Sequence, residues 1–567
     1  MRKTKAALLL PALLCLNGII NAQQVSKGQT QIKVDLSHPL PTGIKPIWAF
    51  FGYDEANYTY MKDGKKLLGE IAKLSPVPVY VRTHNLLTSG DGIPALKWSS
   101  TNAYTETPDG KPVYNWKIVD SIFDTYLQRH MKPLAQVSFM PEALSSKPQS
   151  DGEQTTTDGK KVKHYMGWDE PPKDYAKYAT LVNQWVKHCV ARYGRKEVES
   201  WYWEIWNEPD ISYWRGTVND YIKLYDYCSD AIKRALPTAK VGGPETTNPG
   251  GEKAAAFMRK FLEHVAKGDN LATGKHGVPL DFITFHAKGD PKVIDSTVWM
   301  NIGRQLDNID KGFQIVSSFP TLKNLPIIIG ESDPEGCAAC SEDVYPNNAY
   351  RNGTMYAVYT AESFARIPQI AANRHVNLRG AVTWGFEFED QPWFRGFRDL
   401  ATNGVDKPVL NVFRMMGMMK GKQVPVTLNS PYTYQSIVDS SVRKDAADIN
   451  SVATVAGHTA WVMVWNYHDK NDLEVPVSAV TLNIAGLKAQ RVQVTQYRID
   501  QEHSNSFTAW KKMGSPQNPD AAQYAQLENS GKLAAMGKPQ KAKVTKNRLN
   551  LDVELPRQAV ALFKITW

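Results

Sequence analysis

The sequence predicts an α/β protein: a (β/α)8 TIM barrel followed by a C-terminal β-sandwich domain. Three observations predict this fold. Short apolar runs alternate with amphipathic helical stretches between residues 44 and 420, polar residues gather where those runs end, and strand patterns replace helical ones after residue 420. A chain of 567 residues is also too long to fold around one hydrophobic core of ordinary size, so two or more domains are expected.

The N-terminus has the pattern of an export signal. The basic segment MRKTK is followed by an apolar stretch and by IINA, which suits cleavage after Ala22. The apolar stretch is too short for a permanent membrane span, and we expect no other stable membrane insertion. We therefore predict that residues 1–22 are a signal peptide and that the mature protein is soluble and either periplasmic or secreted.

Charge and cysteine content narrow the set of partners. Removal of Arg2, Lys3 and Lys5 with the signal changes the formal charge from +10 to 10 − 3 = +7. The basic residues are scattered, so no nucleic-acid partner is expected. In an oxidising compartment Cys337 and Cys340 of CAAC can form a local disulfide, with free thiols as the alternative. A zinc site would need a second ligand pair with suitable spacing, and we see no candidate.

Eight apolar runs are the candidate strands of a barrel over residues 44–420. They are residues 45–53, 77–84, 132–140, 199–206, 239–245, 280–287, 325–331 and 379–388. Amphipathic segments such as 174–194 and 219–236 lie between them, with apolar residues every three or four positions. This alternation matches a closed barrel better than an open doubly wound sheet, and no glycine-rich phosphate loop follows the first run.

Residues 421–567 have the pattern of a β-sandwich. The candidate strands are residues 459–468, 475–487, 490–499 and 547–555, and a short helix is possible near 519–528. The N-terminal segment 23–43 contains GQTQIKVDL at residues 28–36, which would add an edge strand to the same sandwich.

Polar side chains follow most candidate barrel strands at their C-terminal ends. They are Arg82 and His84, Asn207 and Glu208, Glu245, His286 and Lys288, Glu331 and Asp333, and Glu387 and Glu389. The C-terminal ends of barrel strands meet at one face, where catalytic groups lie. Any one of these residues could instead be a salt-bridged loop residue, so the inference depends on their convergence.

Two carboxylates that face each other across a barrel mouth suit the cleavage of a glycosidic bond. One must supply a proton, and the other must stay ionised as nucleophile or base. Glu208 follows the aromatic run WYWEIW, which would raise its pKa and suit the acid, and Glu331 ends the run LPIIIG on another strand. Asn207 would bind the 2-hydroxyl group of the sugar.

The decamer WYWEIWNEPD at residues 201–210 resembles the acid/base signature of glycoside hydrolase family 39. Segments 131–144, 280–289, 328–336 and 407–417 resemble other parts of that family, so the resemblance spans roughly residues 40 to 420. It implies a retaining exo-acting enzyme with Glu208 as acid/base and Glu331 as nucleophile. It implies a carbohydrate substrate and neither a metal nor an organic cofactor.

The sugar itself stays open at this stage, because the family contains both β-xylosidases and α-L-iduronidases. FHAKG and GESDPEG resemble the iduronidase branch, where Lys288 would pair with a sugar carboxylate; a pair with a neighbouring acid such as Asp333 is the alternative. His84 matches a substrate-contacting histidine of the family. The other candidate substrate-binding residues are His286, Trp384, Glu387 and Arg395.

We therefore expect a retaining exo-glycosidase that removes terminal β-D-xylosyl residues or residues of similar shape. The alternatives are an α-L-iduronidase-like or α-L-arabinosidase enzyme on the same fold and, from another class, an inactive carbohydrate-binding barrel. Both candidate carboxylates are present at the expected strand ends, which disfavours the inactive barrel. The sequence does not predict the oligomeric state.

Overall fold

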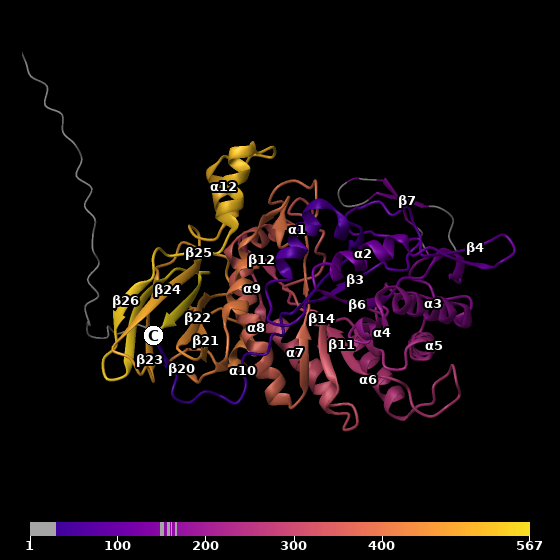
Figure 1. The fold of residues 1–567 in the computed structure, drawn as a ribbon, viewed down its shortest axis with the longest axis horizontal. Helices are drawn as coiled ribbons and strands as arrows, with labels where there is room; N and C mark the ends of the chain where they lie inside the picture. Colours follow the sequence, from indigo (N-terminus) through magenta and orange to yellow (C-terminus); the bar gives the residue numbers. More distant parts are fainter. Residues whose placement is uncertain (1–29, 148–151, 156–158, 160, 165–166) are drawn as a thin grey trace, which may run out of the picture.

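The computed structural model describes residues 30–147, 152–155, 159, 161–164 and 167–567. The expected signal peptide lies outside the described residues. The described chain forms a helix-rich unit and a strand-rich unit beside it (Figure 1). Within these residues, no helix has both the length and the apolar character that a membrane span requires.

The central sheet of the larger unit is a closed barrel of parallel strands. In order around the barrel they are β2 (Phe50–Tyr53), β3 (Tyr80–Thr83), β6 (Lys132–Val137), β9 (Tyr202–Ile205), β10 (Lys240–Thr246), β11 (Phe282–His286), β14 (Pro326–Glu331), β15 (Asn377–Ala381) and β16 (Thr383–Trp384). β15 and β16 are two halves of one strand, interrupted at Val382, and they pair with β14 and β2 respectively. The eighth strand thus joins the seventh to the first, which confirms the predicted (β/α)8 barrel.

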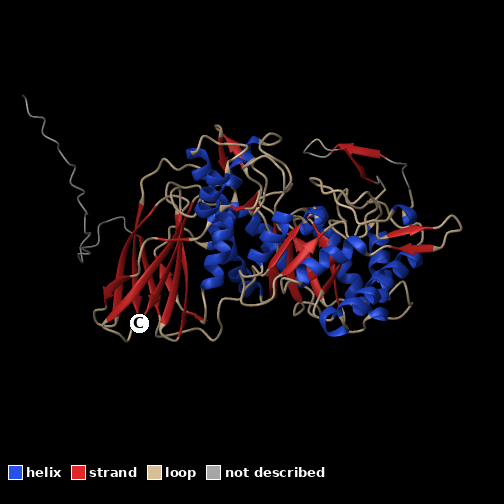
Figure 2. Cartoon of the chain, turned by 45° about the horizontal axis from the view of Figure 1, so that its top comes forward, coloured by secondary structure: helices blue, strands red, loops and turns tan. Residues whose placement is uncertain are grey.

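A helix follows each barrel strand and packs around the outside of the barrel (Figure 2). In chain order these helices are α1 (Lys62–Ile71), α2 (Lys117–Leu127), α3 (Tyr175–Tyr193), α5 (Val218–Ala235), α6 (Glu252–Lys267), α7 (Ile302–Ser317), α8 (Thr354–Arg374) and α9 (Pro408–Met418). The segments predicted as helices, 174–194 and 219–236, correspond to α3 and α5.

The barrel interior has an aromatic floor beneath a polar layer. Tyr80 contacts Tyr202, and Tyr202 contacts Phe282, each with 4.9 Å between ring centroids. Residues two apart on a strand share a face, so Arg82 and Glu204 occupy the next level above Tyr80 and Tyr202. Both charged side chains are fully buried. Polar groups in the interior therefore lie toward the C-terminal end of the barrel, where catalytic groups of such barrels lie.

The second unit is a sandwich of two sheets. One sheet has the order β20 (Val426–Leu428), β1 (Thr30–Asp35), β23 (Ser478–Ala485), β27 (Arg548–Leu555). The other has the order β19 (Lys422–Gln423), β21 (Asp448–Ala456), β22 (Thr459–Tyr467), β28 (Val560–Thr566), β24 (Arg491–Ile499), β25 (Ala534–Ala535), with β26 (Gln540–Lys543) also on β24. β1 lies between β20 and β23, parallel to β23, so it is an interior strand and not the edge strand that we expected.

Smaller elements complete the described chain. They are α4 (Arg195–Val198), α10 (Tyr434–Ser440), α11 (Ser506–Lys512) and α12 (Ala521–Gly531), the short hairpins β4 (Tyr104–Glu106) with β5 (Pro112–Tyr114), β7 (Gly152–Thr155) with β8 (Lys161–His164), β12 (Lys292–Ile294) with β13 (Thr297–Trp299) and β17 (Ala401–Thr402) with β18 (Val405–Asp406), and the 3-10 turns Ala56–Tyr60, Glu142–Leu144 and Pro346–Asn352. The short helix expected near 519–528 corresponds to α12.

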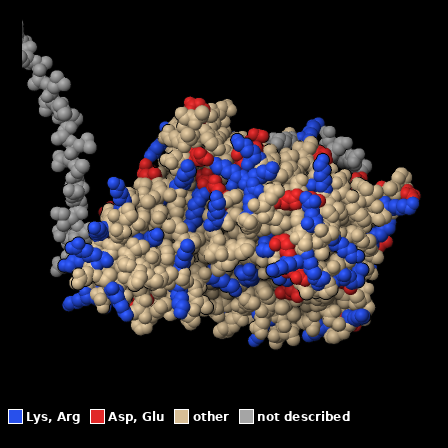
Figure 3. Space-filling view, viewed as in Figure 1, with Lys and Arg blue, Asp and Glu red and all other residues tan. Residues whose placement is uncertain are grey.

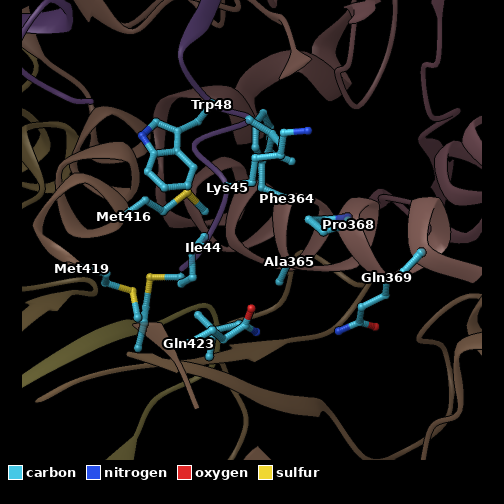
Figure 4. A pocket seen from close by; sticks show the side chains of 14 residues that line it. Ile44, Lys45, Trp48, Phe364, Ala365, Pro368, Gln369, Met416, Met419 and Gln423 are labelled. Carbon is cyan, nitrogen blue, oxygen red and sulfur yellow. The ribbon is translucent and has the colours of Figure 1, made fainter. Parts of the chain in front are cut away.

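The two units share a buried junction. β22 alternates: Met463 and Trp465 belong to the core that continues into the barrel, whereas Val462 and Val464 belong to the sandwich interior. A cavity of about 250 Å³ lies at this junction, beside Trp48 and Met416 (Figure 4). Its described lining contains no acidic side chain, so we treat it as a packing feature of the junction.

Surface charge on the face shown in Figure 3 is spread over the molecule. Lysine and arginine side chains lie over both units, and acidic side chains lie among them over the barrel. This face thus agrees with the scattered basic residues of the sequence.

Candidate active site

In the run WYWEIWNE, side chains on β9 point alternately out of and into the barrel, and a turn of the backbone follows the strand. On β9, Trp203 packs outward against α3 while Glu204 points into the barrel. Beyond the strand, Trp206 and Glu208 have φ values of 71° and 43°, a left-handed conformation that is rare for bulky side chains and often found at functional sites. The Glu208 backbone N–H donates to the carbonyl oxygen of Glu245 at 2.9 Å. This bond fixes the turn that presents Glu208 at the mouth.

The two predicted catalytic carboxylates meet at the mouth. One carboxylate oxygen from Glu208, one from Glu331 and one ring nitrogen of His286 all lie within 4.8 Å of one another. The Glu331 side chain is 4% exposed and that of Glu208 is 14% exposed. Three different strand ends therefore bring these groups together, as the strand-end pattern predicted.

Glu331 is surrounded by cationic side chains. Its oxygens contact Lys288 Nζ, Arg82 Nη1 at 3.2 Å, and the Nε2 atoms of His84 and His286, each at 3.7 Å. Burial alone would raise the pKa of Glu331, but His286, Lys288 and Arg82 outweigh it and hold that pKa well below its usual range. Glu331 is thus held as a carboxylate. The partner of Lys288 is Glu331 itself; Asp333 is a weaker neighbour.

His286 bridges two carboxylates. Its Nδ1 lies 2.7 Å from Glu208 Oε1, and its Nε2 lies 2.7 Å from Glu245 Oε1. Burial lowers the pKa of His286, but Glu331, Glu245 and Glu208 raise it to about 10. A doubly protonated imidazole has no lone pair for a metal. The Glu208, His286 and Glu331 set therefore does not suit a divalent cation in this state.

Arg82 ties the site to the layer below it. Its Nε donates to Glu204 at 2.6 Å, and its Nη2 donates to Asn207 Oδ1 at 2.9 Å and contacts Glu245 at 3.0 Å. Asn207 accepts through its carbonyl oxygen in this contact, and its amide N–H groups make no hydrogen bond among the described residues. Burial raises the pKa of Glu204 to about 8, although Arg82 opposes this.

An aromatic wall lies on one side of Glu331. The Trp384 ring contacts Arg82, with 4.8 Å from the guanidinium carbon to the ring centroid, and its ring centroid is 4.5 Å from that of His84. His84 Nδ1 lies 2.5 Å from Asp54. Next to these residues is a cavity of about 260 Å³, whose lining includes Asp54, His84, Phe139, Trp168 and Tyr213. Aromatic faces with a few fixed polar groups are typical of a small-molecule site.

Two predicted substrate-binding residues have partners outside the cluster of Glu208, His286 and Glu331. Glu387 is buried, accepts the backbone N–H of Gly404, and has a pKa well above its usual range through burial and acidic neighbours. Arg395 forms an ion pair with Asp343 and has a 40% exposed side chain. Among the described residues, neither makes a hydrogen bond or ion pair with Glu208, His286 or Glu331.

Sequence reasoning did not select several residues of the site. Asp54 directly follows β2, so the strand-end rule would have found it. Glu204 is the one charged residue inside an aromatic strand, which is itself a signal of a polar barrel interior. Arg82 and Glu245 were recognised as strand-end residues but not as site residues. Tyr213 lies in a loop and carries no such signal.

Comparison with known proteins agrees with this geometry. The model of glycosyl hydrolases family 39 matches residues 32–546. A β-xylosidase of Caldicellulosiruptor saccharolyticus is 25% identical in an alignment of 470 positions that covers 80% of this chain and 84% of the relative. An α-L-iduronidase of Mus musculus is 24% identical in an alignment of 568 positions that covers 94% of this chain and 80% of the relative.

A solved structure has the same fold. It is a GH39 enzyme from Xanthomonas axonopodis pv. citri, with a TM-score of 0.72 and 20% identity, and the match covers 96% of this chain and 98% of that one. The family model covers most of the present chain, from the first sandwich strand to β26. The chain therefore belongs to glycosyl hydrolases family 39 and is an O-glycosyl hydrolase.

Proposed function

We propose that this protein is a retaining exo-glycosidase with Glu208 as acid/base and Glu331 as nucleophile. The observation that carries the proposal is the separation of less than 4.8 Å between a carboxylate oxygen of each. Carboxyl groups lie about 5–5.5 Å apart in retaining glycosidases and about 6.5–9.5 Å apart in inverting ones, which need room for a water molecule. The short separation leaves no such room.

The proposed reaction has two displacements. Glu331, held ionised by its cationic neighbours, attacks the anomeric carbon while Glu208 protonates the leaving oxygen, and a glycosyl ester forms on Glu331. Glu208 then removes a proton from water, which attacks the ester and releases the sugar. Asn207 donates to the 2-hydroxyl group, and His84 and Trp384 form the wall against which the sugar binds.

We propose a terminal β-D-xylosyl residue as the substrate. The support is the β-xylosidase relatives from Caldicellulosiruptor saccharolyticus and Geobacillus stearothermophilus, which align over 80% and 86% of this chain. Export of the mature enzyme, periplasmic or secreted, is part of the proposal and is supported by the pattern of residues 1–22.

A uronide such as an α-L-iduronide is the second candidate, and the observation that favours it is Lys288. Its Nζ lies at Glu331, and its side chain is 13% exposed at the mouth. A sugar carboxylate bound beside the nucleophile would meet this cation. A neutral xyloside would leave Lys288 as a partner of Glu331 alone.

A panel of aryl glycosides tests these proposals. The β-D-xyloside, α-L-arabinoside and α-L-iduronide are offered to the wild type, Glu208→Gln, Glu331→Gln and a control. The control is Glu389→Gln, which changes a half-buried glutamate in the loop after β16, outside the cluster. We expect turnover of the xyloside that is lost in the first two variants and kept in the third. Preferred turnover of the iduronide, abolished in Lys288→Met, would replace the substrate; no turnover of any would favour an inactive binding barrel.

A further inference from the structure

The hydrogen bonds of His286 determine how many protons the mouth holds. Both ring nitrogens lie 2.7 Å from a carboxylate oxygen, Nδ1 from Glu208 and Nε2 from Glu245, and the side chain is fully buried. A carboxylate can only accept, so each of these two contacts requires a proton between nitrogen and oxygen. One proton is therefore shared by His286 Nδ1 and Glu208 Oε1, whichever atom carries it.

We propose that His286 supplies a proton to Glu208 as Glu208 delivers its own proton to the leaving group, so that the two residues act as one proton store. The inference rests on the proposed acid/base role of Glu208 and extends it. In the first displacement the proton on Glu208 Oε2 passes to the leaving oxygen, and the proton on His286 Nδ1 moves across the hydrogen bond to Glu208 Oε1. The C–O bond breaks, Glu331 becomes a neutral ester, and His286 becomes a neutral imidazole that still donates from Nε2 to Glu245.

Charge balance favours this sequence. Before reaction the cation on His286 faces the carboxyl group of Glu208 and the carboxylates of Glu245 and, at 3.7 Å, Glu331. Ester formation removes the charge of Glu331, whose attraction is the largest of those that raise the pKa of His286. The ring therefore holds its proton less tightly at the moment when the leaving oxygen needs it. In the second displacement Glu208 Oε2 takes a proton from water while the proton on Oε1 returns to His286 Nδ1, which refills the store.

Neighbouring cations keep Glu245 ionised, so it accepts a hydrogen bond from His286 Nε2 throughout the reaction and takes no part in the proton transfer. Arg82 contacts Glu245 at 3.0 Å, and the attraction of Arg82 and His286 outweighs burial and lowers the pKa of Glu245 to about 2. Lys288 contacts Glu331 and not the ring. Among the described residues Glu208 Oε2 has no hydrogen-bond partner, so it remains for the leaving oxygen.

A titration without substrate tests the store directly. Histidines labelled with nitrogen-15 are followed by NMR against pH in the wild type and in Glu331→Gln, a neutral analogue of the glycosylated nucleophile. The signal of His286 is assigned by its absence in His286→Gln. We expect an imidazolium in the wild type at neutral pH and a proton-binding constant at least about tenfold lower in Glu331→Gln. A neutral His286 in the wild type, or an unchanged constant, would overturn the proposal.

Kinetics separate a proton store from a structural support. Phenyl leaving groups need a proton and 2,4-dinitrophenyl groups do not, so His286→Gln should lose at least about 50-fold in kcat/KM on the first and less than about fivefold on the second. Equal losses on both would mean a structural role. His264→Gln, which changes a histidine paired with Asp226 outside the site, is the matched control.

The proposal for His286 can be tested even if the protein turns over no aryl glycoside or if His286→Gln does not fold. If no aryl glycoside is turned over, the titration still decides the protonation of His286. If His286→Gln does not fold, as judged by its thermal transition, Glu245→Gln keeps the ring and removes its other carboxylate. This second variant should lower the proton-binding constant of His286 in the same titration, and a constant equal to that of the wild type would contradict the proposal.

Discussion

Two buried clusters of charged side chains in this protein differ in how many of their carboxylate oxygens have a hydrogen-bond donor. The junction cluster consists of Glu362, Arg366, Asp448 and Trp465, between the barrel and the sandwich. There, Glu362 accepts from Arg366 at 2.7 Å and from Trp465 at 2.5 Å, while Asp448 accepts from Arg366 and from Ser430. Every carboxylate oxygen of this cluster has a donor.

The mouth cluster consists of Arg82, Glu204, Glu208, Glu245, His286, Lys288 and Glu331. One oxygen each of Glu204 and Glu245 is buried with no nitrogen or hydroxyl donor in the described structure, so these two carboxyl groups can be matched only by a proton that they share. Burial raises the pKa of Glu362 to about 7 at the junction, despite Arg366, whereas cations lower that of Glu331 at the mouth. Buried charge is therefore not enough to identify a functional site, because both clusters have it. The mouth cluster differs in having carboxylate oxygens without a donor, several cations around one carboxylate, and partly exposed side chains.

The same substitution in each cluster should have opposite consequences. Glu331→Gln should lower kcat/KM by roughly 10⁴-fold or more, because the proposed nucleophile is lost. Glu362→Gln should keep kcat/KM within about twofold but lower the free energy of unfolding by about 3 kcal/mol, since its amide N–H₂ faces a donor of Arg366 or Trp465. Aryl glycoside kinetics and urea unfolding measure the two effects. Loss of activity in Glu362→Gln without unfolding would break the comparison.

Gly330 packs directly against the Glu245 carboxylate. A Cβ at Gly330 would lie 1.5 Å from Glu245 Oε1, so Gly330→Ala must displace that carboxylate and, with it, His286. We expect kcat to fall by about 10²-fold, as for other small misplacements of catalytic groups. Gly336→Ala is the control, because a Cβ there meets nothing within 4 Å. Equal activities of the two variants would show that the position of Glu245 is unimportant.

The pH dependence of stability should have opposite signs in the two clusters. The pKa of Glu331 is depressed on folding, so its contribution is present above the unfolded value of about 4.3 and is lost as pH falls further. The pKa of Glu362 is raised to about 7, so its contribution is present below about 4.3 and is lost as pH rises through 7. Urea unfolding of wild type, Glu331→Gln and Glu362→Gln between pH 3 and 8 measures this, and parallel profiles would contradict it.

The smallest expected effect comes from the loop that follows β14. The structure joins Cys337 and Cys340 in a disulfide and leaves Cys189 and Cys228 as buried thiols. Closing so short a loop contributes about 2 kcal/mol in the chain-entropy model. A double Cys337→Ser, Cys340→Ser variant should therefore melt a few degrees lower and keep its activity. A large loss of activity would mean that the mouth depends on this loop.

The barrel and the meeting of Glu208 with Glu331 at its mouth were accessible from sequence because both depend on local pattern. Each apolar run is bounded by polar residues, and Asn207–Glu208 and Glu331 stand at strand ends, where topology fixes their direction. Lys288 and His286 were found by the same rule. The alternation of side chains along the strands also points Arg82 and Glu204 into the barrel, although their contact was recognised only in the structure.

Contacts between distant parts of the chain determine the fold of the loop after β16 and the position of β1, which local sequence pattern did not predict. Glu387 and Arg395 belong to the long loop after β16, and a strand end does not determine which way such a loop turns. It folds back so that Arg395 meets Asp343 and Glu387 meets Gly404. The position of β1 between β20 and β23 depends likewise on a partner almost 400 residues away, as in the pairing of Ile32 with Leu428.

The central claim is that Glu331 is the nucleophile of a retaining reaction. The most direct measurement is to inactivate the enzyme with an activated 2-deoxy-2-fluoro derivative of the sugar that it hydrolyses, and to locate the label by mass spectrometry of peptides. The account predicts one fluorosugar per chain, attached to Glu331. A label on another carboxylate, or a first product of inverted anomeric configuration by proton NMR, would contradict it.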